Sequence, residues 1–180
     1  MAYSHNFDPT TLREYDIRGI VGRTLSDEDA FAIGRCFGTI VARHGGRAVA
    51  VGYDGRLSSP SLEEALTHGL MASGMDVSRI GRGPTPMLYY AATTLKSDGA
   101  VMVTGSHNPP DYNGFKMMLA GKPFFGPQIH DLGQMAARGD VVPETPGSER
   151  RIDVSADYVA RLLSDWDGGD RMLKVVWDNG

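Results

Sequence analysis

A short run over residues 104–116 gathers side chains that could perform chemistry. It presents one hydroxyl, Ser106, next to an imidazole, His107, and it ends on an ammonium, Lys116. The apolar stretch Gly99–Val103 predicts a strand leading into the run, and the glycine and prolines inside the run predict a loop. A serine held beside groups that carry positive charge or a proton is suited to accept and release a phosphoryl group.

The second half of this run predicts a tight reversal of the chain. Asp111 to Gly114 contains Asn-Gly, which is a strong hairpin signal. We therefore expect Phe115–Leu119 to return as a second strand. The hairpin would hold Ser106, His107 and Lys116 close together.

Other interpretations of these residues remain open from the sequence. Ser106 could be a turn serine that hydrogen-bonds to a backbone group. A serine hydrolase is disfavoured, because Thr104 and Asn108 stand where a nucleophile elbow needs glycines. His107 could contact a phosphate or shuttle a proton, or it could stack on the neighbouring prolines. Lys116 could serve as an electrostatic partner or proton carrier, or it could be a solvated strand lysine.

The run resembles the α-D-phosphohexomutases, most closely their phosphomannomutase/phosphoglucomutase branch. That family carries Thr-Gly/Ala-Ser-His-Asn-Pro around a serine that is phosphorylated in the resting enzyme. Three further motifs, in the family's order and spacing, are Arg13–Gly19, Gly52–Arg56 and Gly83–Met87. The resemblance covers essentially all 180 residues, as the first domain and the opening of the second.

The resemblance implies a reaction and roles for particular residues. Such enzymes interconvert the 1- and 6-phosphates of mannose or glucose through a phosphoserine and a bisphosphorylated sugar, and hexose 1,6-bisphosphate activates them. Ser106, His107, Lys116 and Arg18 would be catalytic, whereas Tyr15, Arg18 and Lys116 would bind substrate. Two alternatives remain: a phosphoglucosamine mutase-type enzyme, and a non-catalytic domain that binds phosphosugars.

The resemblance also implies one Mg²⁺ per complete enzyme. In the family the metal binds an oxygen of the phosphoserine, here Ser106, and three aspartates of an Asp-Gly-Asp-x-Asp-Arg loop in the second domain. Asp165–Arg171 imitates that loop, but its aspartates are spaced by two and three residues, so we expect an exposed connection. The other metal ligands and the sugar and phosphate loops are therefore absent from this chain, and we expect the fragment alone to be inactive.

Alternating helical and extended patterns predict an α/β fold, a three-layer α/β/α sandwich with a mixed sheet. Ser26 is a plausible N-cap with Asp29 three residues on, and further helices are expected near residues 62–73, 86–95 and 129–136. Strands are expected at residues 47–52, 75–80, 99–103 and 115–119.

The chain divides by composition into one domain and the beginning of another. We expect domain I at residues 1–140, a linker rich in Pro, Gly and charge at 141–152, and the truncated start of a second α/β domain at 153–180. In the last segment, residues 158–166 predict an amphipathic helix and Met172–Trp177 a strand.

Composition narrows the classes of partner. A net charge of −4 argues against a nucleic-acid binder, and no apolar run reaches transmembrane length. The single cysteine, Cys36, fits a buried thiol in a reducing compartment, so we expect a cytoplasmic protein whose partners are hexose phosphates and the remaining domains. Asp54 and Arg56 are close enough to pair within their own loop, and we expect them to be structural. We expect Asn108 to hold the serine loop, and Met117 and Met118 to pack.

Overall fold

A mixed sheet of seven strands forms the centre of the structure, a computed structural model that describes residues 3–169 and 172–178. The strands are β1 (Ile17–Ile20), β2 (Ala48–Tyr53), β3 (Asp76–Arg82), β4 (Gly99–Val103), β5 (Tyr112–Leu119), β6 (Lys122–Phe124) and β7 (Ser148–Arg151). Their order is β1-β5-β4-β2-β3-β7, and β6 pairs with β5. β4, β2, β3 and β7 run parallel, whereas β5 is antiparallel to β4, β1 and β6.

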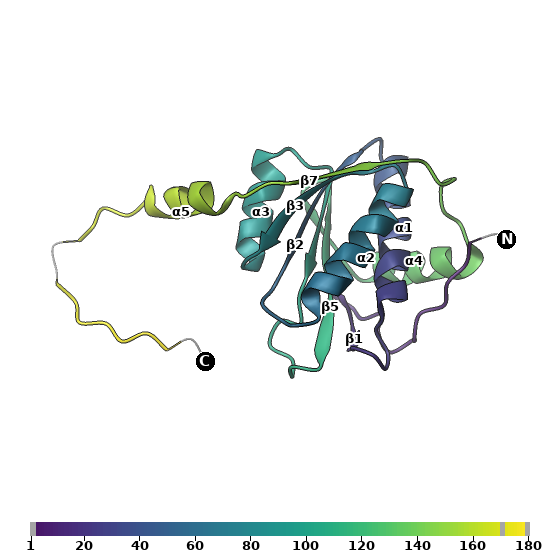
Figure 1. Cartoon of the computed structure of the whole chain (residues 1–180), viewed down its shortest axis with the longest axis horizontal. Helices are drawn as coiled ribbons and strands as arrows, with labels where there is room; N and C mark the ends of the chain where they lie inside the picture. The colour runs from purple at the N-terminus through teal and green to yellow at the C-terminus, as the bar shows by residue number, and fades with distance from the viewer. Residues whose placement is uncertain (1–2, 170–171, 179–180) are drawn as a thin grey trace.

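Helices cover both faces of this sheet, as Figure 1 shows. α1 (Asp27–Arg43), α2 (Ser59–Ala72) and α4 (Pro127–Arg138) pack on one face around a core that includes Phe37 and Phe115. α3 (Thr85–Thr94) packs on the other face, over Ala100 and Met102. The predicted three-layer α/β/α sandwich with a mixed sheet is confirmed.

The start of α1 follows the predicted capping pattern. The Ser26 hydroxyl accepts a hydrogen bond from the backbone N–H of Asp29 at 3.2 Å, and the Asp29 carboxylate accepts one from the backbone N–H of Ser26 at 2.8 Å. This reciprocal pair satisfies two backbone donors that a helix start otherwise leaves without partners.

The predicted reversal at Asn113-Gly114 is wrong, because both residues lie inside β5. The chain turns earlier, between the end of β4 at Val103 and Tyr112. Gly114 lies opposite Arg18 of β1, and a side-chain carbon added there would stand 2.2 Å from the Ile17 carbonyl oxygen. This glycine therefore permits a close approach of two strands and not a turn.

The expected linker at 141–152 contains a strand. β7 pairs in parallel with β3, and the Ser148 hydroxyl donates to Asp76 at 2.7 Å. Arg79 of β3 also forms an ion pair with Glu149 at 2.9 Å. These contacts fix the segment after residue 147 on the edge of the sheet.

Beyond β7 the chain leads away from the sheet to α5 (Ser155–Leu163), as Figure 1 shows. The predicted helix thus ends before Trp166, and the predicted strand at Met172–Trp177 is wrong, because residues 172–178 adopt no regular structure. A strand requires a second strand beside it, and none of the described strands pairs with residues 172–177. The connection after α5 is exposed over residues 165–169, as expected, but Asp170 and Arg171 lie outside the described residues.

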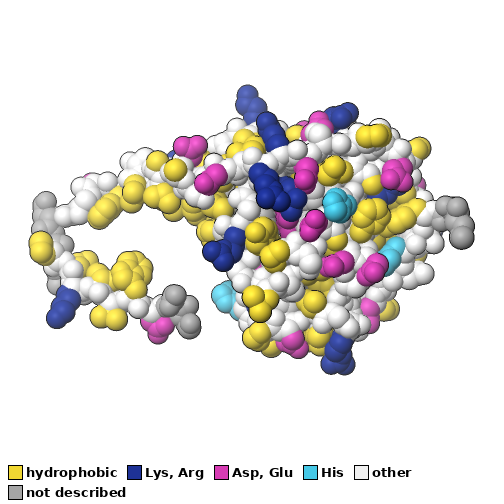
Figure 2. Space-filling view, in the orientation of Figure 1, with side chains coloured by type: hydrophobic (Ala, Val, Ile, Leu, Met, Phe, Trp, Pro, Cys, Tyr) yellow, Lys and Arg dark blue, Asp and Glu magenta, His cyan; other side chains and the backbone are white. Residues whose placement is uncertain are grey.

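Apolar side chains gather along this extension, on the side turned toward the rest of the molecule in Figure 2. Exposed members are Val159, Leu162, Leu163, Trp166 and Trp177. No helix within the described ranges is both long enough and apolar enough to cross a membrane.

Candidate active site

The serine loop begins where β4 ends, beside the end of β2. Neighbouring parallel strands bring their carboxyl ends to one edge of a sheet, where α/β proteins commonly bind ligands. The backbone N–H of Asp54, just after β2, donates to the carbonyl oxygen of Val103 at 2.9 Å. Segments about fifty residues apart therefore meet at Ser106.

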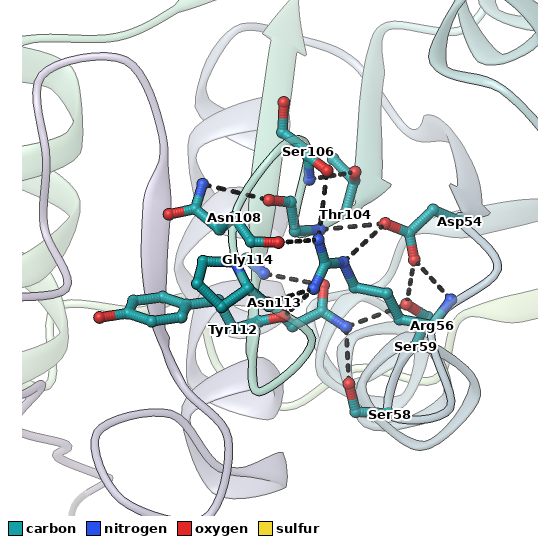
Figure 3. A network of polar contacts seen from close by, with 12 residues as sticks. Asp54, Arg56, Ser58, Ser59, Thr104, Ser106, Asn108, Tyr112, Asn113 and Gly114 are labelled. Atoms are coloured by element: carbon teal, nitrogen blue, oxygen red, sulfur yellow. Dashed lines mark hydrogen bonds and ion pairs between the residues drawn. The ribbon is translucent and has the colours of Figure 1, made fainter. Parts of the chain in front are cut away.

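Ser106 has an unusual backbone conformation. Its φ is 52°, in the left-handed region that residues other than glycine rarely enter. The residue is exposed, and in Figure 3 its hydroxyl points away from the polar network beneath it. Such strain persists only where the surroundings fix the chain, and it clusters at functional sites.

The Arg56 side chain supports the loop from below (Figure 3). Its Nη1 donates to the carbonyl oxygens of Pro109 at 2.6 Å and Tyr112 at 2.9 Å. Its Nη2 donates to the carbonyl oxygens of Ser106 at 3.1 Å and Asn108 at 2.7 Å. One guanidinium thus holds both arms of the loop.

Asp54 holds the same loop through a carboxylate. It accepts hydrogen bonds from the backbone N–H of Gly105 at 3.0 Å and the Ser59 hydroxyl at 2.6 Å, and it faces Arg56 Nε at 3.4 Å. Burial by itself would raise the pKa of Asp54, but hydrogen bonds from Ser59, Arg56, Thr104 and Gly105 outweigh it and lower that pKa below its ordinary value. The carboxylate is therefore held in its charged form.

Three polar side chains complete the support. The Thr104 hydroxyl accepts from the backbone N–H of Ser106 at 2.9 Å, and Asn108 donates to the Gly105 carbonyl at 3.2 Å, as expected for a loop-holding residue. Asn113 is fully buried and donates to the hydroxyls of Ser58 and Ser59, both at 2.9 Å. The start of β5 is thereby joined to the start of α2.

Two cationic side chains, one on β1 and one on β5, gather around a single carboxylate. Asp16 is buried, pairs with the Arg18 guanidinium, and lies 3.6 Å from the Lys116 ammonium. Arg18 Nε is buried without a hydrogen-bond partner among the described residues. The group carries a net positive charge, which suits an anionic ligand.

Three of the predicted site residues line two hollows that share no lining residue. Ser106 lines an open cavity of about 620 Å³ together with Asp54, Arg56 and Asn108. Tyr15 and Lys116 line the second, an apolar hollow of about 450 Å³ beside Phe125, whose ring stacks with Tyr15. His107 is exposed on the loop.

Comparison with known proteins settles the family. The family described as phosphoglucomutase/phosphomannomutase, alpha/beta/alpha domain I, matches residues 9–141. The chain belongs to this family. The phosphomannomutase/phosphoglucomutase of Pseudomonas aeruginosa is 45% identical over 169 residues, which cover 94% of this chain and 36% of that protein.

Two further relatives agree. A phosphoglucomutase of Neisseria gonorrhoeae is 47% identical over 148 residues, covering 82% of this chain and 32% of that protein. The crystal structure of a phosphoglucomutase/phosphomannomutase family protein from Burkholderia thailandensis superposes with a TM-score of 0.84 at 43% identity, over 88% of this chain and 36% of that one. The chain thus spans about a third of the length of these family members.

Among the described residues, no group of three or more His, Cys, Asp or Glu side chains could hold a metal ion. The Asp165 carboxylate, in the segment that imitates the family's metal loop, forms an ion pair with Arg161 at 2.7 Å. The expected metal contact in this chain, Ser106 through a phosphate, stays a prediction.

Sequence reasoning missed two features of this phosphohexomutase domain. Arg56 was assigned to a pair with Asp54 inside its own loop, and its four bonds to the serine loop were not foreseen. Asp16 was not singled out, although it stands two positions from Arg18, on the same side of an extended chain. That alternation was the available signal for Asp16.

Proposed function

We propose that the complete protein containing this chain is a phosphohexomutase that interconverts the 1- and 6-phosphates of mannose or glucose, with Ser106 as the residue that carries phosphate. The observation that carries this proposal is an exposed serine in a strained conformation, held by a partly buried polar network, in a chain of this family. Relatives named phosphomannomutase/phosphoglucomutase and phosphoglucomutase support the substrate class.

The proposed reaction consists of two phosphoryl transfers. A free hydroxyl oxygen of the hexose monophosphate bonds to the phosphorus of phospho-Ser106, the bond between that phosphorus and Ser106 Oγ breaks, and the sugar proton passes to a base. The departing Ser106 Oγ takes up a proton. The bisphosphorylated sugar then reorients, Ser106 Oγ gives up its proton and bonds to the other phosphorus, and the bond from that phosphorus to the sugar oxygen breaks, with a proton passing to that oxygen. The two transfers are chemically similar, so catalysis depends on positioning and on stabilising charge.

The cationic residues have separate roles in this proposal. Arg18 and Lys116 would stabilise the charge that spreads over the transferring group, and Lys116 or His107 would carry the proton. Tyr15, exposed beside Lys116, would contact the sugar ring. Asp16, which pairs with both cations, would orient them.

The remaining parts of the proposal concern the whole protein. Mg²⁺ would bind the phosphate of Ser106 with ligands from outside this chain, and hexose 1,6-bisphosphate would prime the serine. Residues 153–180 would begin a second α/β domain, which the exposed apolar residues of α5 support. A cytoplasmic location agrees with a single, buried thiol.

Intact-mass measurement tests the phosphorylated serine. After incubation of the complete protein with glucose 1,6-bisphosphate and Mg²⁺, we expect a gain of one phosphate. Ser106→Ala should abolish the gain, whereas Ser61→Ala, at an exposed serine of α2, should leave it unchanged. No gain in the wild-type protein would favour a phosphosugar-binding domain over an enzyme.

Turnover assays test the substrate. We expect the complete protein to convert glucose 1-phosphate and mannose 1-phosphate, each with the bisphosphate present. A strong preference for glucosamine 1-phosphate would instead favour a phosphoglucosamine mutase.

A further inference from the structure

Arg56 uses its whole guanidinium group inside the protein. Both terminal nitrogens donate to two carbonyl oxygens each, and Nε faces the Asp54 carboxylate. Arginine offers five N–H donors in one plane. The four on the terminal nitrogens of Arg56 are bound to carbonyl oxygens, and Nε lies in an ion pair with Asp54 at 3.4 Å. No terminal donor remains for a phosphate or a sugar.

Gly105 supplies an independent observation. A side-chain carbon added at Gly105 would lie 2.2 Å from the guanidinium carbon of Arg56. A side chain at residue 105 would therefore collide with the guanidinium group, which occupies that space. The same backbone donates its N–H to Asp54 at 3.0 Å.

We propose that Arg56 is a positioning residue that holds Ser106 in its left-handed conformation, and that it acts by binding loop carbonyls and not by contacting phosphate. This inference rests on the proposed function. Because Arg56 holds the carbonyl of Ser106 itself and those of Asn108 and Pro109, it fixes the chain at and after the strained residue. Without these bonds, Ser106 would relax to a negative φ and its hydroxyl would move.

Substituting lysine for Arg56 distinguishes the role of the planar guanidinium from the role of its charge. Lysine keeps the positive charge beside Asp54, but its compact ammonium group cannot donate to four carbonyl oxygens at once. Arg56→Lys should therefore behave as a loss of function. A role in neutralising phosphate would instead be largely preserved by lysine.

The first experiment compares Arg56→Lys with wild type in the complete protein. We expect kcat, and the rate at which glucose 1,6-bisphosphate phosphorylates Ser106, to fall by about 10²-fold, the usual effect of a misplacement of about 1 Å. The KM for glucose 1-phosphate should change less than about twofold, because Arg56 has no terminal donor left for the sugar. Hydrogen exchange of the amides at residues 104–108 should become faster.

Arg47→Lys is the matched control. Arg47 also forms a close pair with an aspartate, Asp76, but it lies at the opposite end of β2. The control should keep wild-type kcat, KM and loop exchange. A KM that rises while kcat is kept in Arg56→Lys, or wild-type kinetics in that variant, would overturn the proposal.

A double-mutant cycle tests the contact between Arg56 and Gly105. Gly105→Ala alone should slow Ser106 phosphorylation, because the methyl group displaces the guanidinium. In an Arg56→Ala background the same change should add less than about twofold, since its clashing partner is gone. If the slowing of Ser106 phosphorylation in the double variant equalled the product of the slowing in the two single variants, the two residues would act separately. That result would overturn the proposal.

The outcomes distinguish this inference from the proposed function. If wild-type protein takes up no phosphate, the proposed function fails first. If wild-type protein is phosphorylated and Arg56→Lys is phosphorylated equally fast, the enzyme stands and the positioning role fails.

Discussion

The Asn113 side chain shows how one residue can secure the serine loop. It is fully buried, donates to Ser58 and Ser59, and accepts from the backbone N–H of Gly114 at 2.9 Å. Asn113→Ala leaves these groups buried without their partner, so we expect the free energy of unfolding to fall by about 2 kcal/mol. Urea denaturation measures this change, with Asn6→Ala, at an exposed position, as the control. An equal effect of both substitutions would contradict the expected role.

Asn113 and Gly114 show what the sequence could not reveal at the scale of single residues. The loop between Ser106 and Lys116 was predictable, because its glycine and prolines interrupt regular structure. Asn113-Gly114 gave a misleading turn signal, because local preference cannot reveal that Gly114 meets the Ile17 carbonyl on a strand nearly a hundred residues earlier. The reach of Arg56 to Ser106 was hidden for the same reason, since fifty residues separate them.

The pair between Glu63 and Arg79 fastens α2 to β3. Glu63 is 1% exposed, and its carboxylate accepts from Arg79 Nε at 2.9 Å and from a second guanidinium nitrogen. Glu63→Ala leaves a mostly buried guanidinium without its main partner, so we expect a loss of about 3–5 kcal/mol in the free energy of unfolding. Asp165→Ala, which breaks the exposed pair with Arg161, should cause no measurable change. Equal stability of the two variants in urea would refute this prediction.

The capped start of α1 makes part of the stability depend on pH. Burial alone would raise the pKa of Asp29, but hydrogen bonds from His5 and Ser26 outweigh it and lower the pKa below its ordinary value of 3.8. A carboxyl with a lowered folded-state pKa stabilises the protein above its unfolded pKa and loses that contribution as pH falls through the folded value. We therefore expect stability to drop as pH falls from about 5 to below 3.

Urea denaturation across that pH range checks the role of Asp29. Asp29→Asn should be less stable at pH 6 and should show a shallower loss on acidification. Asp8→Asn is the control. It removes an exposed carboxylate whose pKa is also lowered, chiefly by a hydrogen bond from the Thr10 hydroxyl and then by one from the backbone N–H of Thr10. A pH profile of Asp29→Asn parallel to that of wild type would exclude the mechanism.

Elements with strong local patterns were predictable. The capping box and apolar spacing of α1 and the uninterrupted apolar run of β4 mark both elements. β1, β6 and β7 were not predicted, because they are only three or four residues long and exist through their pairing partners. The sequence Ser-Glu-Arg-Arg of β7 is exposed throughout and has no apolar face, so only its pairing with β3 makes it a strand.

The reactivity of the Cys36 thiol measures how tightly the whole molecule is packed. Cys36 is a residue of α1 and is fully buried in the core, and burial raises its pKa to about 12. Because the thiolate is the reactive form, we expect negligible reaction of the folded protein with a disulfide reagent at pH 8 and complete reaction in denaturant. Reaction of native protein at the rate of a free thiol would contradict this packing.

The apolar face of α5 tests the proposed second domain. Leu162 is 58% exposed in this chain, so Leu162→Asp should leave the stability of the 180-residue protein unchanged. In the complete protein the same substitution should cost about 2 kcal/mol, if a second domain buries this side chain. Thermal unfolding of both lengths measures the difference. If Leu162→Asp left the stability of the complete protein unchanged, the apolar face of α5 would not be part of a second hydrophobic core.

The serine loop depends on contacts that span 50 to 56 residues, from Arg56 to Ser106, Pro109 and Tyr112. Such contacts form only after distant strands have paired, because closing the intervening chain costs entropy. The loop that presents Ser106 is therefore not formed in a nascent chain in which β5 has not yet joined the sheet. Under the proposed function, a half-folded chain would then take up no phosphate at Ser106, without any separate safeguard.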